Sequence, residues 1–368
     1  MNTASLAGAV TVPFLGALMC AAPALTRPTL QFGVRVPRER AGTPVIGRER
    51  RAYYWRTGAI GVCAAVAALA LAVRGTWWLP RIILLLQLVA DLGCYLAARR
   101  KISAAKNAGN WFAGLRQTVV ADTSWRTDPP RFPVGWLVPA IAVLTATAVV
   151  GVLRYPDLPG RIAIRFATSG APDRWARKSP FSAFAMVVGQ GYVTVLWTGL
   201  LLIIHRSRPD LDAASPATST RRYRRFLSLF TRAVLTLLAL VNLSLLLEAL
   251  RRWQVYRLSG SGAALPLVPF VAGMLILVAV AVRTGQGGSR LGAGGVAGPA
   301  AGSDRDDDRF WKGGLIYVNR GDAAVMVGAR FGVGFTFNLG NPIAWLVLGG
   351  IAAGVAGLTV IGLAAGTV

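Results

Sequence analysis

The sequence predicts an all-α polytopic membrane protein with about eight transmembrane helices and a small cytoplasmic β-hairpin unit before the last span. Its 368 residues are 54% hydrophobic and only 15% charged, whereas a soluble domain of this size carries about 25% charged residues. Several apolar runs reach the roughly 20 residues that cross a bilayer. A soluble core could not bury all of these runs, so we expect them to lie in a membrane.

The apolar runs set the organisation of the chain. Candidate spans lie at about 5–25, 57–73, 82–98, 133–153, 181–204, 229–250, 264–282 and 343–366. Along the chain we therefore expect six consecutive parts: 1–132 with the first three spans and basic cytoplasmic loops, 133–204 with a span pair enclosing the motif 154–180, 205–283 with spans six and seven, a Gly-rich linker at 284–303, a small β unit at 304–342, and the last span at 343–368.

The basic residues predict the orientation. The net charge of +25 would indicate nucleic acid binding in a soluble protein, but here the charge sorts by loop. Loops after the odd-numbered spans hold 28 Lys and Arg residues, and loops after the even-numbered spans hold 11. The positive-inside rule places the odd loops in the cytoplasm. We therefore expect a multi-pass protein of a bacterial cell membrane, with both termini outside and with contacts to anionic headgroups rather than nucleic acid.

The polar segment before the last span predicts local structure. LIYV and AVMV have strand character, and the NRGD between them is a turn signal. FGVGFTFNL is a candidate third strand. We expect a hairpin or a three-stranded unit that leans on the helices. The glycine-rich stretch before it has nothing to pack, and the acidic run DRDDD is interpreted as a solvated turn rather than a cation site, because it lacks an EF-hand pattern.

Residues for catalysis are scarce. The only histidine is His205, and no Ser/His/Asp set, convincing pair of carboxylates or phosphate-binding loop occurs. Cys20, Cys63 and Cys94 all fall inside predicted spans, without disulfide or metal-ligand spacing. We therefore predict a protein that is not an enzyme and that uses no cofactor and no metal.

A few polar residues fall inside the predicted spans. Asp91 lies near the middle of span three, with Gln87 one turn earlier on the same face. A carboxylate in hydrocarbon is costly unless it is paired, hydrated or protonated. Two interpretations stay open: an ion or proton site, or a structural pair with a cation such as Arg232. Glu248 and Asn242 on span six are weaker candidates of the same kind.

The loop RYPDLPGRIAIRFATSGAPDRWARKSP, residues 154–180, is unusually structured for a connection between two spans. Tyr-Pro and Leu-Pro favour extended or turn backbone, and Gly170 is free to take a positive φ in a turn. RIAIRF can form a short strand or lie across the interface. We expect a shaped external surface, held at the headgroups by Trp175 and basic residues; the alternative is a loop that only ties two spans together.

This loop resembles domain of unknown function 1648, a family found in SdpI-type bacterial membrane immunity proteins. The matching residues are Tyr155, Pro156, Leu158, Pro159, Ile162, Phe166, Gly170, Asp173 and Lys178. Arg165 stands where the family usually has histidine, which puts any histidine-dependent role in doubt.

A C-terminal segment resembles domain of unknown function 5808, and FGVRVP at 32–37 is similar to the first-loop motif of the same relatives. The matching residues are Trp311, Lys312, Gly314, Tyr317, Asn319, Asp322, Val327, Arg330, Gly332, Gly334 and Asn338. The two resemblances imply a non-enzymatic membrane protein in toxin immunity or envelope-stress signalling, with a peptide toxin or a cytoplasmic regulator as partner. The alternative is a secondary transporter with a polar site around Asp91.

Overall fold

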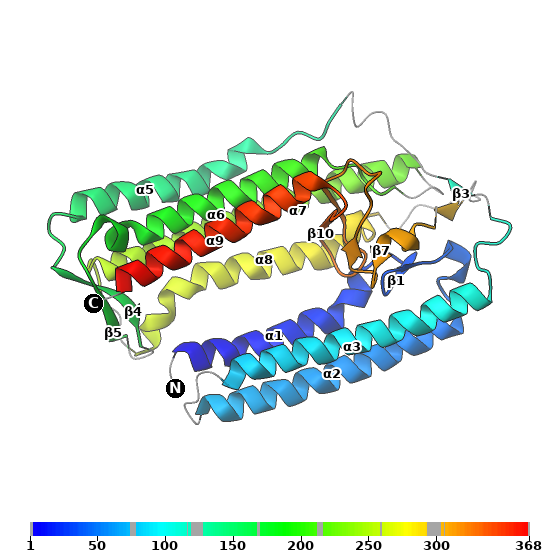
Figure 1. The fold of residues 1–368 in the computed structure, drawn as a ribbon, viewed down its shortest axis with the longest axis horizontal. Helices are drawn as coiled ribbons and strands as arrows, with labels where there is room; N and C mark the ends of the chain where they lie inside the picture. The colour runs from blue at the N-terminus through cyan, green and yellow to red at the C-terminus, as the bar shows by residue number, and fades with distance from the viewer. Residues whose placement is uncertain are drawn as a thin grey trace. The chain divides into compact units, whose positions relative to one another are not determined.

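The computed structural model describes residues 3–73, 79–115, 117–118, 128–167, 170–211, 216–257, 260–292, 303–304 and 306–366. Long helices dominate these residues (Figure 1). They are α1 (Thr3–Leu25), α2 (Pro44–Val73), α3 (Leu79–Ala108), α5 (Val138–Arg154), α6 (Pro180–Arg206), α7 (Pro216–Arg252), α8 (Val268–Thr284) and α9 (Pro342–Gly366). Each coincides with one predicted span, so the predicted fold class is confirmed.

Seven of these helices, over the residues that the structure describes, are long and apolar enough to cross a membrane. The exception is α1, whose apolar part, Thr11–Leu25, is shorter than the apolar parts of the other seven helices. Helices α2 and α7 begin earlier than predicted. Polar residues before the apolar run, such as Tyr53 and Arg225, are helical too, and proline stands at the first position of both helices, where its fixed φ suits a helix start.

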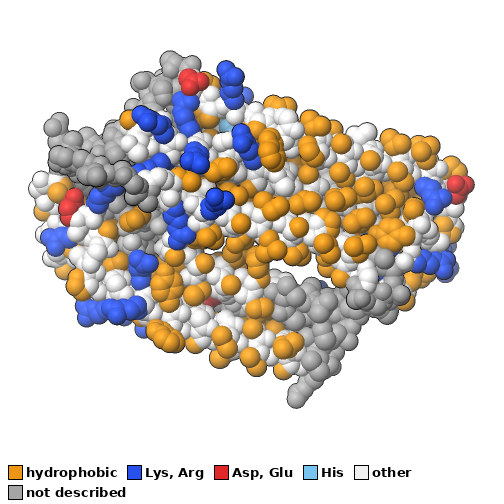
Figure 2. All heavy atoms as spheres, turned by 180° about the vertical axis from the view of Figure 1, so that it is seen from behind, with side chains coloured by type: hydrophobic (Ala, Val, Ile, Leu, Met, Phe, Trp, Pro, Cys, Tyr) orange, Lys and Arg blue, Asp and Glu red, His pale blue; other side chains and the backbone are white. Residues whose placement is uncertain are grey.

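Apolar side chains cover the outside of the helices. Val62, Val195 and Leu346 are 65%, 75% and 75% exposed. Figure 2 shows hydrophobic side chains along the helices and Lys and Arg toward their ends. A soluble protein would bury such side chains, because their transfer from water is favourable. The exposed surface therefore fits the hydrocarbon of a bilayer.

The chain divides into two compact units, each assembled from separate parts of the sequence. Unit 1 combines Met1–Pro130, Ser207–Leu227 and Ala281–Ala344, and contains the bundle of α1, α2 and α3. Unit 2 combines Arg131–Arg206, Ser228–Val280 and Trp345–Val368, and contains α5, α6, α8 and the apolar parts of α7 and α9. Both units interleave along the chain, so the six consecutive parts expected from the sequence stay a prediction.

Unit 1 carries short strands beyond its helices. Antiparallel pairs are formed by β1 (Leu30–Gln31) with β2 (Val34–Arg35), β7 (Trp311–Lys312) with β8 (Ile316–Tyr317), and β9 (Met326–Gly328) with β10 (Phe335–Phe337). The parallel pair is β3 (Gln117–Thr118) with β6 (Ser303–Asp304). Short 3-10 turns lie at Arg38–Arg40, Gln286–Gly288 and Asp308–Phe310.

The predicted pairing of LIYV with AVMV is wrong. Strand β8 pairs with the upstream β7, and β9 pairs with the downstream β10. The buried side chain of Asn338 explains the difference. Its amide nitrogen donates to the carbonyls of Asn319, Asp322 and Ala324, and its oxygen accepts from the Asn319 amide. The Asn338 side chain thus makes the hydrogen bonds to the backbone of the turn that the strands of a hairpin would otherwise make. Asparagine is common in turns because its side chain bonds to the backbone in this way.

An aromatic core ties the first loop to the bundle of unit 1. Phe32 is buried between Tyr53, Tyr95 and Phe331, with ring centroids 5.1 to 6.2 Å apart. Phe32 and Gly33 both have positive φ, of 49° and 72°, as in the tight two-residue turns of hairpins. Glycine is required at position 33, because a Cβ there would lie 2.4 Å from the Tyr95 hydroxyl.

Unit 2 has a polar contact inside its helices. The Asn242 amide on α7 donates to the Ala140 carbonyl and to Thr194 on α6, both at 3.0 Å. Gln190 on α6 donates to Thr147 on α5 and to the Asn242 carbonyl, at 3.0 and 2.7 Å. Because interhelical hydrogen bonds help to associate helices in a membrane, this cluster fixes how the three helices pack.

Candidate functional site

The loop 154–180 of unit 2 folds into a β-hairpin, which we call the cap. Strand β4 (Arg161–Phe166) pairs antiparallel with β5 (Pro172–Arg177) (Figure 1). Gly170 closes the turn with a φ of 88°, and its amide donates to the Ala167 carbonyl at 3.0 Å. The predicted strand and the predicted positive φ are both confirmed. The buried residues of the hairpin are Ile162 and Ala163 on β4 and Ala176 on β5, and the other residues of β5 are exposed.

Apolar motif residues hold the cap against the helix ends. Leu158 and Ile162 are buried in a cluster with Ala183, Ala249 and Trp253. The indole nitrogen of Trp253 donates to the Ala183 carbonyl at 3.0 Å. This cluster joins the cap to α6 and α7, since Ala183 lies on α6 and Ala249 on α7. The motif residues Leu158 and Ile162 therefore serve to pack the cap against the helices.

Lys178 fixes the Tyr-Pro and Leu-Pro bends. Its ammonium donates to the carbonyls of Pro156 and Leu158, at 3.0 and 2.9 Å, and lies 5.1 Å from the centre of the Tyr155 ring. A charged donor compensates carbonyls that the prolines leave outside any ladder. Pro159, the remaining proline of the motif, is exposed.

The turn of the cap is held by α7. The guanidinium of Arg251 lies 3.8 Å from the centre of the Phe166 ring, and it donates to the Gly170 carbonyl at 3.3 Å. Phe166 and Gly170 therefore meet the same helix end. A cation over an aromatic face is attracted by the ring quadrupole, which orders the turn.

Arg165 and Asp173 form an ion pair on the outer side of the cap. The Arg165 Nε atom donates to both carboxylate oxygens of Asp173, at 2.9 and 3.0 Å. The hydrogen bond and the charge of Asp173 raise the pKa of Arg165. Both side chains are exposed, at 64% and 36%. The residue that departs from the family pattern thus has a direct partner within the motif.

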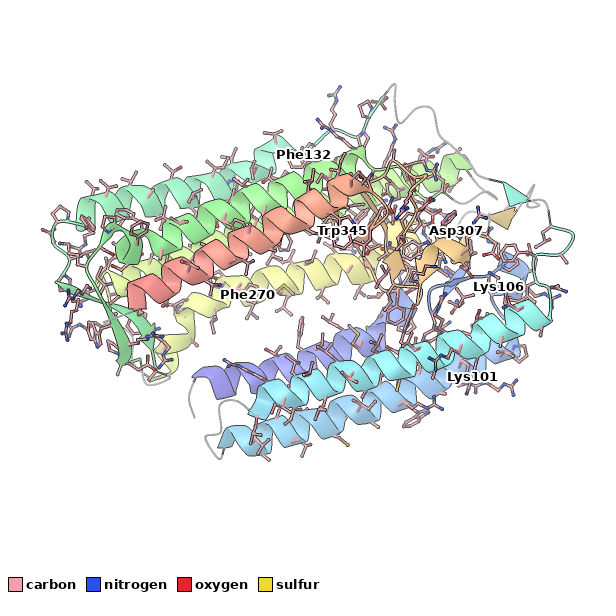
Figure 3. The ribbon with its side chains drawn as sticks, viewed as in Figure 1. Lys101, Lys106, Phe132, Phe270, Asp307 and Trp345 are labelled. Carbon is pink, nitrogen blue, oxygen red and sulfur yellow. The ribbon has the colours of Figure 1, made fainter. Side chains whose placement is uncertain are left out.

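Unit 1 contains a second arginine-rich site, which we call the ion-paired cluster. Arg35, on β2, donates to Asp307 at 2.8 Å, and Lys106, near the end of α3, donates to Asp308 at 2.6 Å. Lys106 and Asp307 are labelled in Figure 3. Arg330 binds both Asp307 and Asp308. The members of the cluster are Arg27, Arg35, Lys106, Asp210, Asp306, Asp307, Asp308 and Arg330.

Charge balance governs the ionisation of this cluster. Burial raises the pKa of Asp308, but Arg330 and Lys106 outweigh it, so the pKa lies below its usual value. Burial also raises the pKa of Asp210, but the charges of Arg35 and Arg27 outweigh this effect and lower the pKa to about 2. Asp308 and Asp210 therefore stay ionised at neutral pH. Removing one cation would leave a carboxylate uncompensated, which is costly at a buried site.

The interpretation of DRDDD as a solvated turn is wrong. Asp307 and Asp308 are only 26% and 20% exposed, and Arg330, which binds both, is 1% exposed. The first residues of the predicted Gly-rich linker are packed as well. Gln286 is buried and donates to the carbonyls of Ala329 and Gly334, at 2.9 and 3.0 Å. The rest of that linker, from 293 to 302, lies outside the described residues.

A cavity of about 310 Å³ adjoins the ion-paired cluster within unit 1. Its wall includes Trp311, Tyr317, Asn319, Asp322 and Arg330. With Val327, which also lines the cavity, six predicted motif residues are thus brought together around one space. Arg208 and Asp210 from the loop after α6 complete it.

Three glycines of the C-terminal motif allow backbone conformations with positive φ. Gly314, Gly332 and Gly334 have positive φ, of 74°, 75° and 140°, and the Gly334 amide donates to Gln286 at 2.8 Å. Lys312 is exposed. Within the described residues, no group of three or more His, Cys, Asp or Glu side chains is placed to hold a metal ion.

Asp91 and Gln87 lie inside the α1–α3 bundle. Both are 2% exposed, and none of their side-chain oxygen or nitrogen atoms has a hydrogen-bond partner among the described residues. Gly16 on α1 makes room for Gln87, since a Cβ there would lie 2.7 Å from its amide nitrogen. Close packing at glycine is typical of membrane helices.

Arg232 and Glu248, the other charged residues predicted within spans, have contacts of their own in unit 2. The guanidinium of Arg232 lies 5.8 Å from the centre of the Trp136 ring. Glu248 binds Arg252, one turn later on α7, at 3.3 Å. Asp91 belongs to unit 1 and Arg232 to unit 2, so a structural pair between them stays a prediction. The Asn242 and Gln190 contacts, by contrast, join helices and were only partly anticipated, because glutamine in an apolar run carries no spacing signal.

Comparisons with known proteins concern the cap. Residues 142–190 match the model of the family described as Domain of unknown function (DUF1648). No curated protein and no solved structure matched the chain. The resemblance of the C-terminal segment to domain of unknown function 5808 stays a prediction. The matched residues include the end of α5, the whole cap and the start of α6. The segment that builds the cap is therefore a DUF1648 segment, in a chain with the helices of a multi-pass membrane protein.

Proposed function

We propose that this protein is a non-enzymatic membrane protein of the SdpI-related type, which acts in toxin resistance or envelope-stress signalling in the cell membrane. In this proposal the cap is the external surface that meets a peptide toxin or another ligand. The observation that carries the proposal is that some residues of the cap attach it to the helices while others are exposed. Leu158, Ile162 and Lys178 hold it to the helices, while the pair of Arg165 and Asp173 remains exposed.

A loop that only connected α5 to α6 would not need this construction. Ordering backbone costs about 1–2 kcal/mol for each residue, and here that cost is offset by a packed cluster, a lysine bridge and an arginine from α7. A surface that is ordered before its partner arrives loses less entropy on binding. The ordered exposed face of the cap therefore favours recognition over simple connection.

The ion-paired cluster and its cavity suit the proposed cytoplasmic side of the function. The charge distribution of the loops predicts that this region faces the cytoplasm. The cavity offers charged and aromatic side chains, among them Arg208, Asp322 and Tyr317. A cytoplasmic regulator is the partner that we propose for it.

Growth under toxin challenge tests the proposal. The gene would be deleted, and the wild type, Asp173→Ala or Asp157→Ala would be restored at matched protein levels. Cells would then meet a panel of membrane-active peptides and material secreted by neighbouring strains. We expect deletion to sensitise the cells, Asp173→Ala to fail to protect, and Asp157→Ala to protect, because Asp157 is an exposed aspartate of the same loop outside the Arg165 pair. Unchanged survival of the deletion strain would contradict the proposal.

Transport is a second candidate function, because Asp91 and Gln87 are buried without hydrogen-bond partners among the described residues. A carboxyl group in this environment can bind a proton or a cation. The test is proton or solute flux in liposomes that contain the purified protein, with Asp91→Asn against Asp128→Asn, a carboxylate outside the spans that binds Arg224. Loss of flux in Asp91→Asn alone would support transport. Absence of flux in the wild type would exclude it for those solutes.

A further inference from the structure

Three exposed arginines of the cap, Arg161, Arg174 and Arg177, have no ion pair with any residue that the structure describes, and we propose that they bind the phosphate groups of anionic phospholipids. The cap would then rest on the headgroup layer of the membrane. This inference goes beyond the proposed function and uses other residues: Arg161, Arg174, Arg177 and Trp175, rather than Asp173. It holds whether or not a toxin meets the cap.

The register of the hairpin places arginines opposite each other twice. Arg161 on β4 pairs with Arg177 on β5, and Arg165 pairs with Arg174. Side chains directly opposite in an antiparallel pair have Cβ atoms about 4.5–5.5 Å apart, and like charges there are destabilising. Asp173 lies within the hairpin and binds Arg165, so the pair of Arg161 and Arg177 is the one for which compensation from outside the hairpin is expected.

Among the residues that the structure describes, a carboxylate compensates one of the four arginines. Asp173 binds Arg165. Arg161, Arg174 and Arg177 are exposed, and the structure shows no ion pair or hydrogen bond of their guanidinium groups with any described residue. The guanidinium group binds phosphate through two parallel hydrogen bonds. A phosphate between Arg161 and Arg177 would supply both the missing charge and the missing acceptors.

The place of the cap in the chain favours a lipid phosphate. The cap follows Leu153 and precedes Phe181, which are 69% and 68% exposed. Apolar side chains with this exposure at helix ends suit the edge of the hydrocarbon layer, so the arginines between them lie at headgroup level. Trp175 is 40% exposed and shares a face with Arg177, because residues two apart in a strand point the same way. Tryptophan is enriched at this level of a membrane.

Lipid retention tests the inference. The purified full chain would be taken from mixed micelles with equal phosphatidylglycerol and phosphatidylcholine, and its bound lipids counted by native mass spectrometry. The variants are the double substitution Arg161→Gln with Arg177→Gln, the charge-conserving Arg161→Lys with Arg177→Lys, and Arg208→Gln with Arg309→Gln as a control that removes the same charge outside the cap. A parallel arm adds an acidic peptide to each sample.

We expect the wild type and the control to prefer phosphatidylglycerol, and the glutamine pair to lose this preference by roughly twentyfold, since each arginine near a membrane surface contributes about fivefold. The lysine pair should fall between them. It keeps the charge, so it tests the inference even if the glutamine pair fails to fold. Equal lipid preference in the glutamine pair and the control would overturn the inference. Wild-type binding to the acidic peptide with no lipid preference would overturn it too, and would assign the face to a protein partner.

Discussion

Both the cap and the ion-paired cluster are rich in arginine, but they use it in opposite ways. In the cluster, Arg35 and Arg330 are buried and each binds aspartate. In the described part of the cap, Arg161, Arg174 and Arg177 are exposed, and Arg165 is the arginine that binds a carboxylate. A buried charge needs a partner of opposite charge within the fold. An exposed charge is solvated by water and remains available to bind a partner from outside the protein. The comparison separates arginines that hold structure from arginines that are available for recognition.

The largest expected effect comes from removing a buried arginine. Arg330→Ala should destabilise the protein by about 3–5 kcal/mol, because it leaves Asp307 and Asp308 without a main partner at a buried site. The measurement is thermal unfolding of the purified protein in detergent. Arg208→Ala, which changes an exposed arginine beside the same cavity, is the control. A similar melting temperature in both variants would show that the cluster is not a structural centre.

The second effect separates the two faces of the cap. Ile162→Ala removes a fully buried side chain from the cluster with Trp253, and large-to-small changes in a packed core cost about 2–4 kcal/mol. Arg161→Gln, its exposed neighbour, should change stability by less than about 0.5 kcal/mol. Limited proteolysis of the cap would compare the two. Faster cleavage in Arg161→Gln than in Ile162→Ala would contradict the assignment of faces.

The smallest of the three effects depends on pH. The pKa of Asp210 lies at about 2 in the folded protein, against an ordinary 3.8. Its contribution to stability is therefore present above about pH 4 and is lost as the pH falls toward 2. We expect about 1 kcal/mol, after allowing for solvent screening of a side chain that is 43% exposed.

Asp210→Asn should therefore be less stable than the wild type at pH 7 by about that amount, and the difference should shrink between pH 4 and pH 2. Unfolding by denaturant at several pH values would measure it. The same shift with Asp157→Asn, an exposed aspartate of the cap, would show that the effect is not specific to the ion-paired cluster.

The sequence was sufficient for the helices and for the backbone of the cap. Apolar runs longer than a bilayer is thick allow few other structures, and each predicted span is a helix. Gly170 and the strand RIAIRF followed from local preferences, which act over a few residues. These features depend on neighbours in the chain, and neighbours are visible in a sequence.

The ion-paired cluster depends on residues that are distant in the chain. Arg35 and Asp307 are separated by 272 positions, and Lys106 and Asp308 by 202. An acidic run has the same composition whether it is solvated or buried, so DRDDD alone could not show its partners. The turn around Asn338 was missed for a related reason: strand propensity predicted a ladder, while one buried amide satisfies the turn.

The side of the membrane on which each arginine-rich region lies is the most direct test. Cys20, Cys63 and Cys94 would be changed to serine, and a single cysteine introduced by Ala171→Cys in the cap or Arg208→Cys beside the cavity. Both positions are exposed. Intact cells would be treated with a maleimide that does not cross membranes. We predict labelling of Ala171→Cys in intact cells and of Arg208→Cys only after permeabilisation. Labelling in the reverse order would contradict an external cap and, with it, the proposed function.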